Sequence, residues 1–514
     1  EVRLASEVRL ASEVRLASEV RLASRGLVPN RGHGRLRGRN AKPGRAWVSA
    51  LARHLRSPAG MTALAPAFPA VDEALVSRYD VAGPRYTSYP PVPVWRTDTR
   101  ADDRIQALQQ ARTDKGLALY VHLPFCESRC RFCGCNVVVA KDRDRAEAYI
   151  DRVLQEFQSV LDLWGDRRPR LRSLHLGGGT PTFLREDQLN RLLRPMLDAF
   201  DLDEDKEFAL EAEPSVTTES QLKALADLGF DRISFGVQDL DESVLEMVER
   251  PSRRRQVQGL TEAARALGFR SVNYDFIYGL PGQVPERWAE TLEGLLDLQP
   301  DRVAIYSFAW LPEQRPHQKR LGRFWMPTGP DKLGLFAQAY RRLLQGGYRA
   351  VGMDHFALPS DSLAVAQREG SLGRNFQGYT THSEAEVLGL GMSAISDIGG
   401  WYLQNPSVLR AYDQGVETGR WAPARAWRRS REDDRRRRVI QSLMCNFQVH
   451  FREGDVAALR SELQRLAEPE YRDLVDVSFD GLDLTPLGRI FVRNVAMVFD
   501  GYSTDRQSPY SRTV

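Results

Sequence analysis

The chain has little cysteine and no long apolar run. Five of its 514 residues are cysteine, and four of these five lie within the ten residues from Cys126 to Cys135. No run of about 18 apolar residues is present, so we predict no membrane insertion. Clustered thiols in a chain without a recognisable secretory signal favour a reducing compartment over disulfides. We therefore expect a cytoplasmic protein whose cysteines form one site.

Positive charge is concentrated in the first 60 residues. The chain carries +4 overall, but residues 1–60 hold thirteen Lys and Arg against four Glu. The remainder is therefore mildly acidic, at about −5, and we predict no nucleic-acid partner. Residues 1–24 repeat one six-residue unit four times. A six-residue period matches neither the 3.5-residue nor the 3.6-residue repeat of apolar positions on a helix. We interpret this leader as translated upstream sequence with the start at Met61; a targeting arm or an RNA-binding tail is the alternative.

The spacing of the clustered cysteines predicts an iron–sulfur site. Cys126, Cys130 and Cys133 follow C-x3-C-x2-C spacing, directly after the strand-like run 117–123. Three thiolates from one loop can hold a four-iron cluster and leave one iron without a protein ligand. A small molecule can coordinate that iron and receive an electron. A zinc knuckle is the alternative, but zinc sites prefer a second cysteine pair or histidines, and Cys445 is isolated.

The residues around the cysteines resemble the signature of the radical S-adenosylmethionine (SAM) enzymes. Tyr120, His122, Pro124 and Phe125 lead into the loop, and Phe132 precedes the third cysteine. In that superfamily three cysteines hold a four-iron, four-sulfur cluster, and the open iron chelates the amino and carboxylate groups of SAM. One electron then cleaves SAM to a 5′-deoxyadenosyl radical. The resemblance therefore implies this cluster and SAM as cofactors.

A fourth clustered cysteine narrows the resemblance. Cys135 completes a C-x3-C-x2-C-x-C pattern, which is similar to the signature of the oxygen-independent coproporphyrinogen III oxidases (dehydrogenases). Segments 83–90, 352–356 and 375–379 are similar to the same family. The resemblance implies oxidative decarboxylation of the ring A and B propionates of coproporphyrinogen III to vinyl groups, giving protoporphyrinogen IX in haem biosynthesis. It also implies a low-potential electron donor such as flavodoxin or ferredoxin, and a monomer.

Two other functions are compatible with the three ligand cysteines. The related haem chaperones bind and transfer haem, but they lack the fourth cysteine and the segment at 84–89, both of which this chain has. A radical SAM methyltransferase acting on a tetrapyrrole is a weaker alternative. Product analysis separates the three, because only the oxidase forms vinyl groups and carbon dioxide, the chaperone retains haem, and the transferase methylates the macrocycle.

After residue 100 the sequence alternates between strands and helices. The clearest amphipathic helix lies at 149–164, where apolar residues recur at three- and four-residue spacing. Strand-like runs lie at 117–123, 171–176, 207–212, 231–237, 271–277 and 302–308. Six strand–helix units in order predict an α/β fold with a parallel sheet and right-handed crossovers. The resemblance implies that this sheet is an open six-unit (β/α) barrel.

These patterns divide the chain into four parts. We expect the leader at 1–60, a segment that covers the barrel mouth at 61–110, the barrel at 111–400 and a mostly helical domain at 401–514. The basic run 435–438 in the last part is interpreted as a solvated helix start rather than a binding patch.

Candidate cofactor ligands follow or end the predicted strands, at the rim where βα loops build active sites. Gly178 and Gly179 allow the backbone to approach a ligand closely. Glu211 places a carboxylate in the barrel mouth, where burial costs free energy unless the group has a partner. The resemblance implies two SAM molecules side by side, with Gly178 and Gly179 near both. Around the cluster-bound SAM it implies Tyr120, Glu211, Ala309 and Ile395. Around the second it implies Phe132, Thr180, Gln238, Arg250 and Asp275.

Four further residues receive auxiliary assignments. Cys135 is expected to be structural or to tune the site rather than to bind the cluster. His122 is interpreted as a packed hydrogen-bond partner, with proton or electron transfer as the alternative. Arg85 and Gln377 are candidates for binding the substrate carboxylates, because guanidinium and amide groups donate hydrogen bonds to them.

Overall fold

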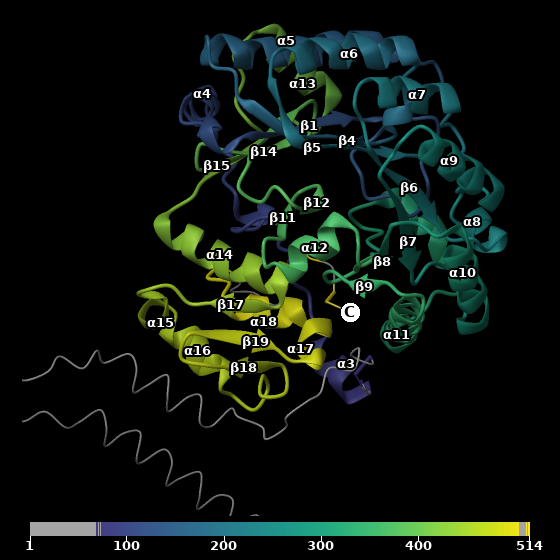
Figure 1. The fold of residues 1–514 in the computed structure, drawn as a ribbon, viewed down its shortest axis with the longest axis vertical. Helices are drawn as coiled ribbons and strands as arrows, with labels where there is room; N and C mark the ends of the chain where they lie inside the picture. The colour runs from purple at the N-terminus through teal and green to yellow at the C-terminus, as the bar shows by residue number, and fades with distance from the viewer. Residues whose placement is uncertain (1–67, 70, 72, 503–509, 511, 514) are drawn as a thin grey trace, which may run out of the picture. The chain divides into compact units, whose positions relative to one another are not determined.

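The fold is built on one mixed sheet, which has twelve strands in the part of the chain that the structure describes (Figure 1). The computed structural model describes residues 68–69, 71, 73–502, 510 and 512–513. The predicted leader at 1–60 lies outside the described residues. Within the described ranges, no helix is long and apolar enough to cross a membrane.

Six parallel strands in chain order form the centre of the sheet. They are β1 (Leu117–Leu123), β4 (Arg170–Gly178), β5 (Asp201–Ala212), β6 (Arg232–Gln238), β7 (Ser271–Tyr278) and β8 (Arg302–Ser307). The six predicted strands are thereby confirmed. Most side chains of β1 are buried on both faces, which explains why this strand reads as a continuous apolar run.

Shorter strands extend both edges of this parallel core. On one side β13 (Glu386–Leu390) pairs in parallel with β1, and antiparallel strands follow. These are β14 (Ile395–Ile398), β15 (Trp401–Gln404) and β16 (Arg425–Arg428). On the other side β8 is followed by β10 (His355–Ala357) and β9 (Arg349–Ala350). Because β16 and β9 are not paired with each other, the sheet stays open.

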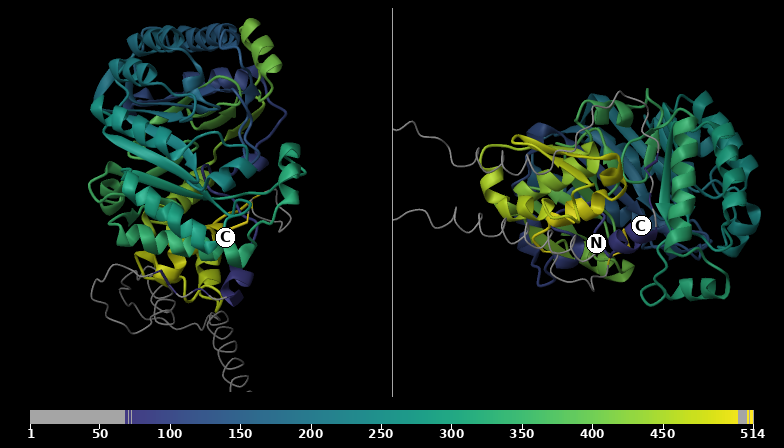
Figure 2. Two further views of the ribbon diagram at one scale, coloured as in Figure 1. Left: turned by 90° about the vertical axis from the view of Figure 1, so that its right-hand side faces the viewer. Right: turned by 90° about the horizontal axis from the view of Figure 1, so that it is seen from below.

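Helices connect the parallel strands and lie on the outer side of the curved sheet (Figures 1 and 2). They are α5 (Arg145–Trp164), α6 (Glu186–Asp198), α7 (Glu219–Asp227), α8 (Glu242–Met247), α9 (Arg254–Ala266), α10 (Pro285–Leu298) and α11 (Gly329–Gln345). The predicted helix at 149–164 is part of α5, whose apolar face buries Ile150, Val153 and Phe157. Burial of this face attaches the helix to the sheet.

A second apolar core lies in the C-terminal part of the chain. It is built by α14 (Arg431–Asn446), α16 (Arg460–Leu466) and α18 (Val492–Val498), with a sheet of β17 (Gln448–His450), β19 (Gly481–Leu484) and β18 (Val475–Val477). Tyr79, Tyr86 and Tyr89 from the N-terminal segment are buried in this core. Strands β18 and β19 pair as an antiparallel hairpin. Although β15 and β16 lie beyond residue 400, they belong to the main sheet, so the four-part division stays a prediction.

The basic run 435–438 is not a solvated helix start, contrary to the sequence interpretation. All four arginines are half-buried and form ion pairs. Arg437 lies 2.7 Å from Asp397 of β14, and Arg435 and Arg438 contact Asp455. These acids come from segments distant in sequence, so the local charge run did not reveal them.

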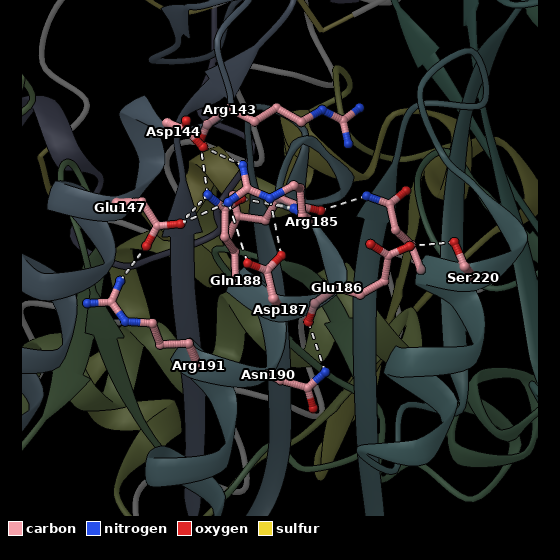
Figure 3. A network of polar contacts seen from close by, with 12 residues as sticks. Arg143, Asp144, Glu147, Arg185, Glu186, Asp187, Gln188, Asn190, Arg191 and Ser220 are labelled. Atoms are coloured by element: carbon pink, nitrogen blue, oxygen red, sulfur yellow. Dashed lines mark hydrogen bonds and ion pairs between the residues drawn. The ribbon is translucent and has the colours of Figure 1, made fainter.

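A network of charged side chains joins α5 to α6 on the outer surface (Figure 3). Arg185 Nη1 lies 2.6 Å from Asp144 Oδ1, and its Nη2 lies 3.2 Å from Glu147 Oε1. The other oxygen of Glu147 accepts from Arg191 Nη1 at 2.6 Å. Arg185, Glu147 and Arg191 therefore each have an opposite charge within hydrogen-bond distance.

Candidate active site

The cysteine loop leaves the carboxyl end of β1 and is closed at its base by backbone hydrogen bonds. Val138 N donates to Pro124 O at 2.8 Å, and Ala140 N donates to Cys126 O at 2.9 Å. Gly179 packs directly against this base, where an added Cβ would lie 2.6 Å from Pro124 O. The glycine run is thus required by the approach of two backbone segments to each other, in addition to any ligand.

One cavity of about 840 Å³ gathers most of the predicted ligands beside this loop. A volume of this size is typical of small-molecule and cofactor sites. We refer to it as the cluster cavity. The predicted site residues that line it are Cys126, Cys130, Phe132, Cys133, Cys135, Gly178, Gly179, Thr180, Glu211, Gln238, Arg250 and Asp275.

The thiols of the loop have few partners within the chain. Cys126 Sγ lies 3.4 Å from Thr180 Oγ1, and Arg250 Nη1 lies 3.6 Å from Cys130 Sγ. Burial raises the pKa of Cys126 to about 11, so its thiolate requires compensation by a cation. In the described ranges, no three His, Cys, Asp or Glu side chains are placed to hold one metal ion. A cubane does not need such convergence, because each cysteine binds a different iron. The donor set therefore fits an iron–sulfur cluster.

Glu211 ends β5 and projects into the cluster cavity. Burial opposes its ionisation, but His175 Nε2 at 3.5 Å and the Gly178 N–H at 3.2 Å stabilise the carboxylate. Together they hold the pKa of Glu211 below its usual value. Gly177 leaves room for this carboxylate, since an added Cβ would lie 2.9 Å from Oε1. Glu211 is therefore an anion held at the cavity wall.

The pKa of Asp275 on β7 is shifted in the opposite direction from that of Glu211. The carboxyl group of Asp275 accepts hydrogen bonds from Ser234 Oγ at 2.8 Å and from Asn273 Nδ2 at 2.9 Å. Burial nevertheless raises its pKa to about 6, with a contribution from the negative charge of Glu211. The two carboxyl groups in the cavity thus differ in how readily they ionise.

Arg250 follows α8 and is buried beside the cysteine loop. It forms an ion pair with Glu213 and donates to Gly236 O. The carboxylate of Glu213, two residues beyond Glu211, is thus the partner of this arginine. The Nε of Arg250 has no hydrogen-bond partner in the described residues.

A smaller cavity of about 150 Å³ adjoins the cluster cavity within the barrel. We refer to it as the inner cavity; Glu211, Ser234, Asp275 and Tyr306 line both. Tyr120 and Gln377, both predicted, line the inner cavity, with residues that sequence reasoning missed. These are His175, Ser234, Asn273, Tyr306, His355, Asn375 and Tyr379. Several of them alternate with apolar residues along a strand, and this two-residue period of polar side chains was the available signal.

Four of the predicted site residues line neither cavity, namely Ala309, Ile395, Arg85 and His122. Ala309 O accepts from Gln318 Nε2 at 3.3 Å, and the same amide donates to Phe132 O at 3.0 Å, so Ala309 lies beside the cysteine loop. Arg85 forms an ion pair with Asp354. His122 is buried, 3.0 Å from Tyr120 OH and 3.1 Å from Asn136 O.

Comparison with known proteins places this site in a class. Residues 120–295 match the radical SAM superfamily. Together with the parallel barrel and the cysteine loop, this match identifies a radical SAM enzyme.

The family within that class follows from full-length relatives. The chain is 40% identical over 459 residues to the oxygen-independent coproporphyrinogen III oxidase of Pseudomonas aeruginosa, covering 86% of this chain and 98% of the relative. It is 39% identical over 452 residues to the enzyme of the same name from Escherichia coli K12, covering 86% and 98%. The solved structure of coproporphyrinogen III oxidase (HemN) from Escherichia coli, described as a radical SAM enzyme, superposes with a TM-score of 0.78 at 38% identity, covering 84% of this chain and 99% of that one. The chain belongs to the oxygen-independent coproporphyrinogen III oxidases.

Proposed function

We propose that this enzyme oxidatively decarboxylates the ring A and ring B propionates of coproporphyrinogen III, giving protoporphyrinogen IX. The observation that carries the proposal is the gathering of three cysteine thiols, Glu211 and Asp275 around one cavity of about 840 Å³. The names of the full-length relatives support the substrate. The haem-chaperone alternative receives no support from them.

Cys126, Cys130 and Cys133 hold the four-iron cluster in this proposal, and Cys135 does not. A cluster held by these cysteines would supply the electron that cleaves SAM, and the 5′-deoxyadenosyl radical would take a hydrogen atom from the β-carbon of a propionate, giving 5′-deoxyadenosine. The substrate radical would then lose carbon dioxide and pass one electron to an external electron acceptor, which leaves the vinyl group. Arg250 beside Cys130 contributes positive charge next to the thiolates. The walls of the cavity position the reactants and exclude water.

Two SAM molecules are proposed to bind side by side. Tyr120 and Glu211 serve the molecule on the cluster, where an ionised Glu211 can accept hydrogen bonds from a ribose or an ammonium group. The second molecule is assigned to Phe132, Thr180, Gln238, Arg250 and Asp275, all of which line the cluster cavity. The SAM-binding roles of Tyr120, Ala309 and Ile395 rest on the family resemblance alone, because none of the three lines the cluster cavity.

The remaining partners are proposed from the chemistry. A low-potential donor such as flavodoxin or ferredoxin supplies the electron, and the enzyme acts as a cytoplasmic monomer. Gln377 is retained as a substrate contact because it lines the inner cavity.

The test is anaerobic reconstitution with iron and sulfide, followed by reaction with coproporphyrinogen III, SAM and a reductant. We expect protoporphyrinogen IX, two carbon dioxide molecules per macrocycle and 5′-deoxyadenosine. Retained haem without turnover would favour the chaperone, and a methylated macrocycle would favour the transferase. Either outcome would contradict the proposal.

A further inference from the structure

Arg374 is a buried arginine without an anionic partner. It lies on the short strand β11 (Gly373–Asn375), which pairs with β12 (Gly378–Thr380) so that Arg374 is opposite Tyr379. The residue is 6% exposed. Its Nε and Nη1 have no hydrogen-bond partner among the described residues. The guanidinium instead lies on the ring of Tyr379, with Cζ 4.6 Å from the ring centroid.

Three other arginines whose side chains are mostly covered do have such partners. Arg302 Nε lies 2.8 Å from Asp361, Arg429 pairs with Asp397 and Asp434, and Arg250 pairs with Glu213. Burial of an unpaired guanidinium is costly, and a contact with an aromatic ring only partly compensates for the lost hydration. Arg374 therefore differs from these three in lacking a carboxylate.

The acid nearest to this region is already engaged. One carboxylate oxygen of Asp354 accepts from Arg85, and the other lies 2.7 Å from His355 Nδ1. Arg493 is buried close by, and its guanidinium donates to the backbone carbonyls of Gly83 and Pro84. Burial and the positive charge of Arg85 lower the pKa of Arg493 to about 9. The charges of Arg85 and Arg374 thus act on one aspartate, which leaves an excess of positive charge among these described residues.

This excess charge lies beside the inner cavity. Asn375 and Tyr379, the strand neighbour and the strand partner of Arg374, both line that cavity. Arg85 lies over the ring of Tyr306, with Cζ 5.8 Å from its centroid, and Tyr306 lines both cavities. The inner cavity is much smaller than the cluster cavity, about 150 against 840 Å³, so it suits a side chain of a large substrate rather than the macrocycle.

We propose that Arg374 binds a propionate carboxylate of the tetrapyrrole substrate, which enters the inner cavity while the reacting propionate lies in the cluster cavity. This inference rests on the proposed function. A carboxylate matches the two adjacent N–H groups of a guanidinium. The long arginine side chain can move from the Tyr379 ring towards the cavity. The carboxylate of SAM is the other source of this chemistry. Arg374 itself lines neither cavity, but its strand neighbour Asn375 and its strand partner Tyr379 line the inner cavity and not the cluster cavity, to which SAM is assigned.

The test compares Arg374→Met and Arg374→Lys with a matched control, Arg429→Met, because Arg429 lines neither cavity. Anaerobic ultrafiltration measures the dissociation constants of coproporphyrinogen III and of SAM for each reconstituted enzyme. We expect Arg374→Met to bind coproporphyrinogen III at least tenfold more weakly, Arg374→Lys to recover part of this loss, and SAM binding and iron content to match the wild type.

The melting temperature of the ligand-free enzyme gives an independent readout. Arg374→Met should be as stable as the wild type or more stable, because it removes an unpaired buried charge. Arg429→Met should melt at a lower temperature, because it removes a cationic partner of Asp397 and Asp434. A lower melting temperature for Arg374→Met would overturn the proposal, since the guanidinium would then be structural.

Two binding results would also overturn it. These are unchanged affinity for coproporphyrinogen III in Arg374→Met, and weakened SAM binding with unchanged substrate affinity, which would assign the guanidinium to SAM. The wild type separates this inference from the proposed function. A wild-type enzyme that does not bind or convert coproporphyrinogen III would contradict both, whereas conversion by the wild type with equal binding by Arg374→Met would contradict only the role of Arg374.

Discussion

Charged side chains on the outer face of α5 and α6 have partners of opposite charge, whereas some polar groups inside the barrel have no partner among the described residues. On the outer face, Arg185, Glu147 and Arg191 satisfy one another and remain in contact with solvent (Figure 3). In the barrel, Arg374 and the amide oxygen of Asn273 are buried without hydrogen-bond partners from the described residues. Surface ion pairs contribute little stability, whereas unsatisfied buried groups reduce it. The comparison indicates that the interior groups are retained for ligands.

The largest effect is expected at Glu211. Glu211→Ala should lower SAM cleavage in the absence of substrate by roughly 100-fold, because reacting groups tolerate little displacement. The measurement is the initial rate of 5′-deoxyadenosine formation under reducing, anaerobic conditions. Glu186→Ala on the outer face is the control and should retain the wild-type rate. Equal rates in the wild type and Glu211→Ala would contradict the view that the cavity groups serve a ligand and the outer groups do not.

The variant Asp275→Ala should weaken the binding of one SAM molecule and leave the binding of the other unchanged. We expect this variant to keep the cluster-bound SAM, to lose the second, and to form protoporphyrinogen IX roughly tenfold more slowly, an effect within the range for lost substrate positioning. Equilibrium filtration gives the number of SAM molecules per chain. Loss of the cluster-bound molecule in Asp275→Ala, with its retention in Glu211→Ala, would reverse the assignment.

The pH dependence of stability should change in Asp275→Asn. The pKa of Asp275 is about 6 in the folded enzyme, above the value of about 3.9 in an unfolded chain. The folded state therefore holds this proton more tightly, and its ionisation lowers the free energy of unfolding as pH rises from about 4 to 6. At pH 7 the loss is at most about 3 kcal/mol. Urea unfolding of the ligand-free proteins at pH 4.5 and 7 should show the variant gaining stability relative to the wild type at the higher pH; a constant difference would contradict this.

The smallest effect is expected on the outer face. Glu147→Gln removes one of the acidic partners of Arg185 and of Arg191. It should lower the free energy of unfolding by only about 0–1 kcal/mol, because solvent already screens these charges. Added salt should reduce even this difference. Thermal unfolding and turnover check the prediction. A loss of several kcal/mol, or any loss of activity, would show that the outer network supports the site.

The parallel core was predictable because its strands are buried on both faces. The run at 117–123 has the bounds of β1, and the helix at 149–164 is found within α5. The edge strands β9, β10 and β13 to β16 were not predicted. Strands of two to five residues with irregular pairing leave little periodicity to detect.

The site was predictable where residues belong to a compact motif and not where the fold assembles them. The cysteine motif and the predicted strand ends at β4 to β7 identified most of the site residues that line the cluster cavity. Arg374 directly precedes a segment used to recognise the family, but its lack of an acidic partner depends on Asp354 being engaged by Arg85 and His355. Arg85 was proposed as a carboxylate ligand, and its ion pair with Asp354 is a contact that no local pattern reveals.

The central claim is that Cys126, Cys130 and Cys133 hold the cluster and that Cys135 does not. Its most direct test is the iron and sulfide content of four variants after anaerobic reconstitution. Cys126→Ser, Cys130→Ser and Cys133→Ser should each lose the four-iron cluster, because thiolate is the required ligand. Cys135→Ser should retain close to the wild-type content. An equal loss of iron in all four variants, or a full cluster in any of the first three, would contradict the account.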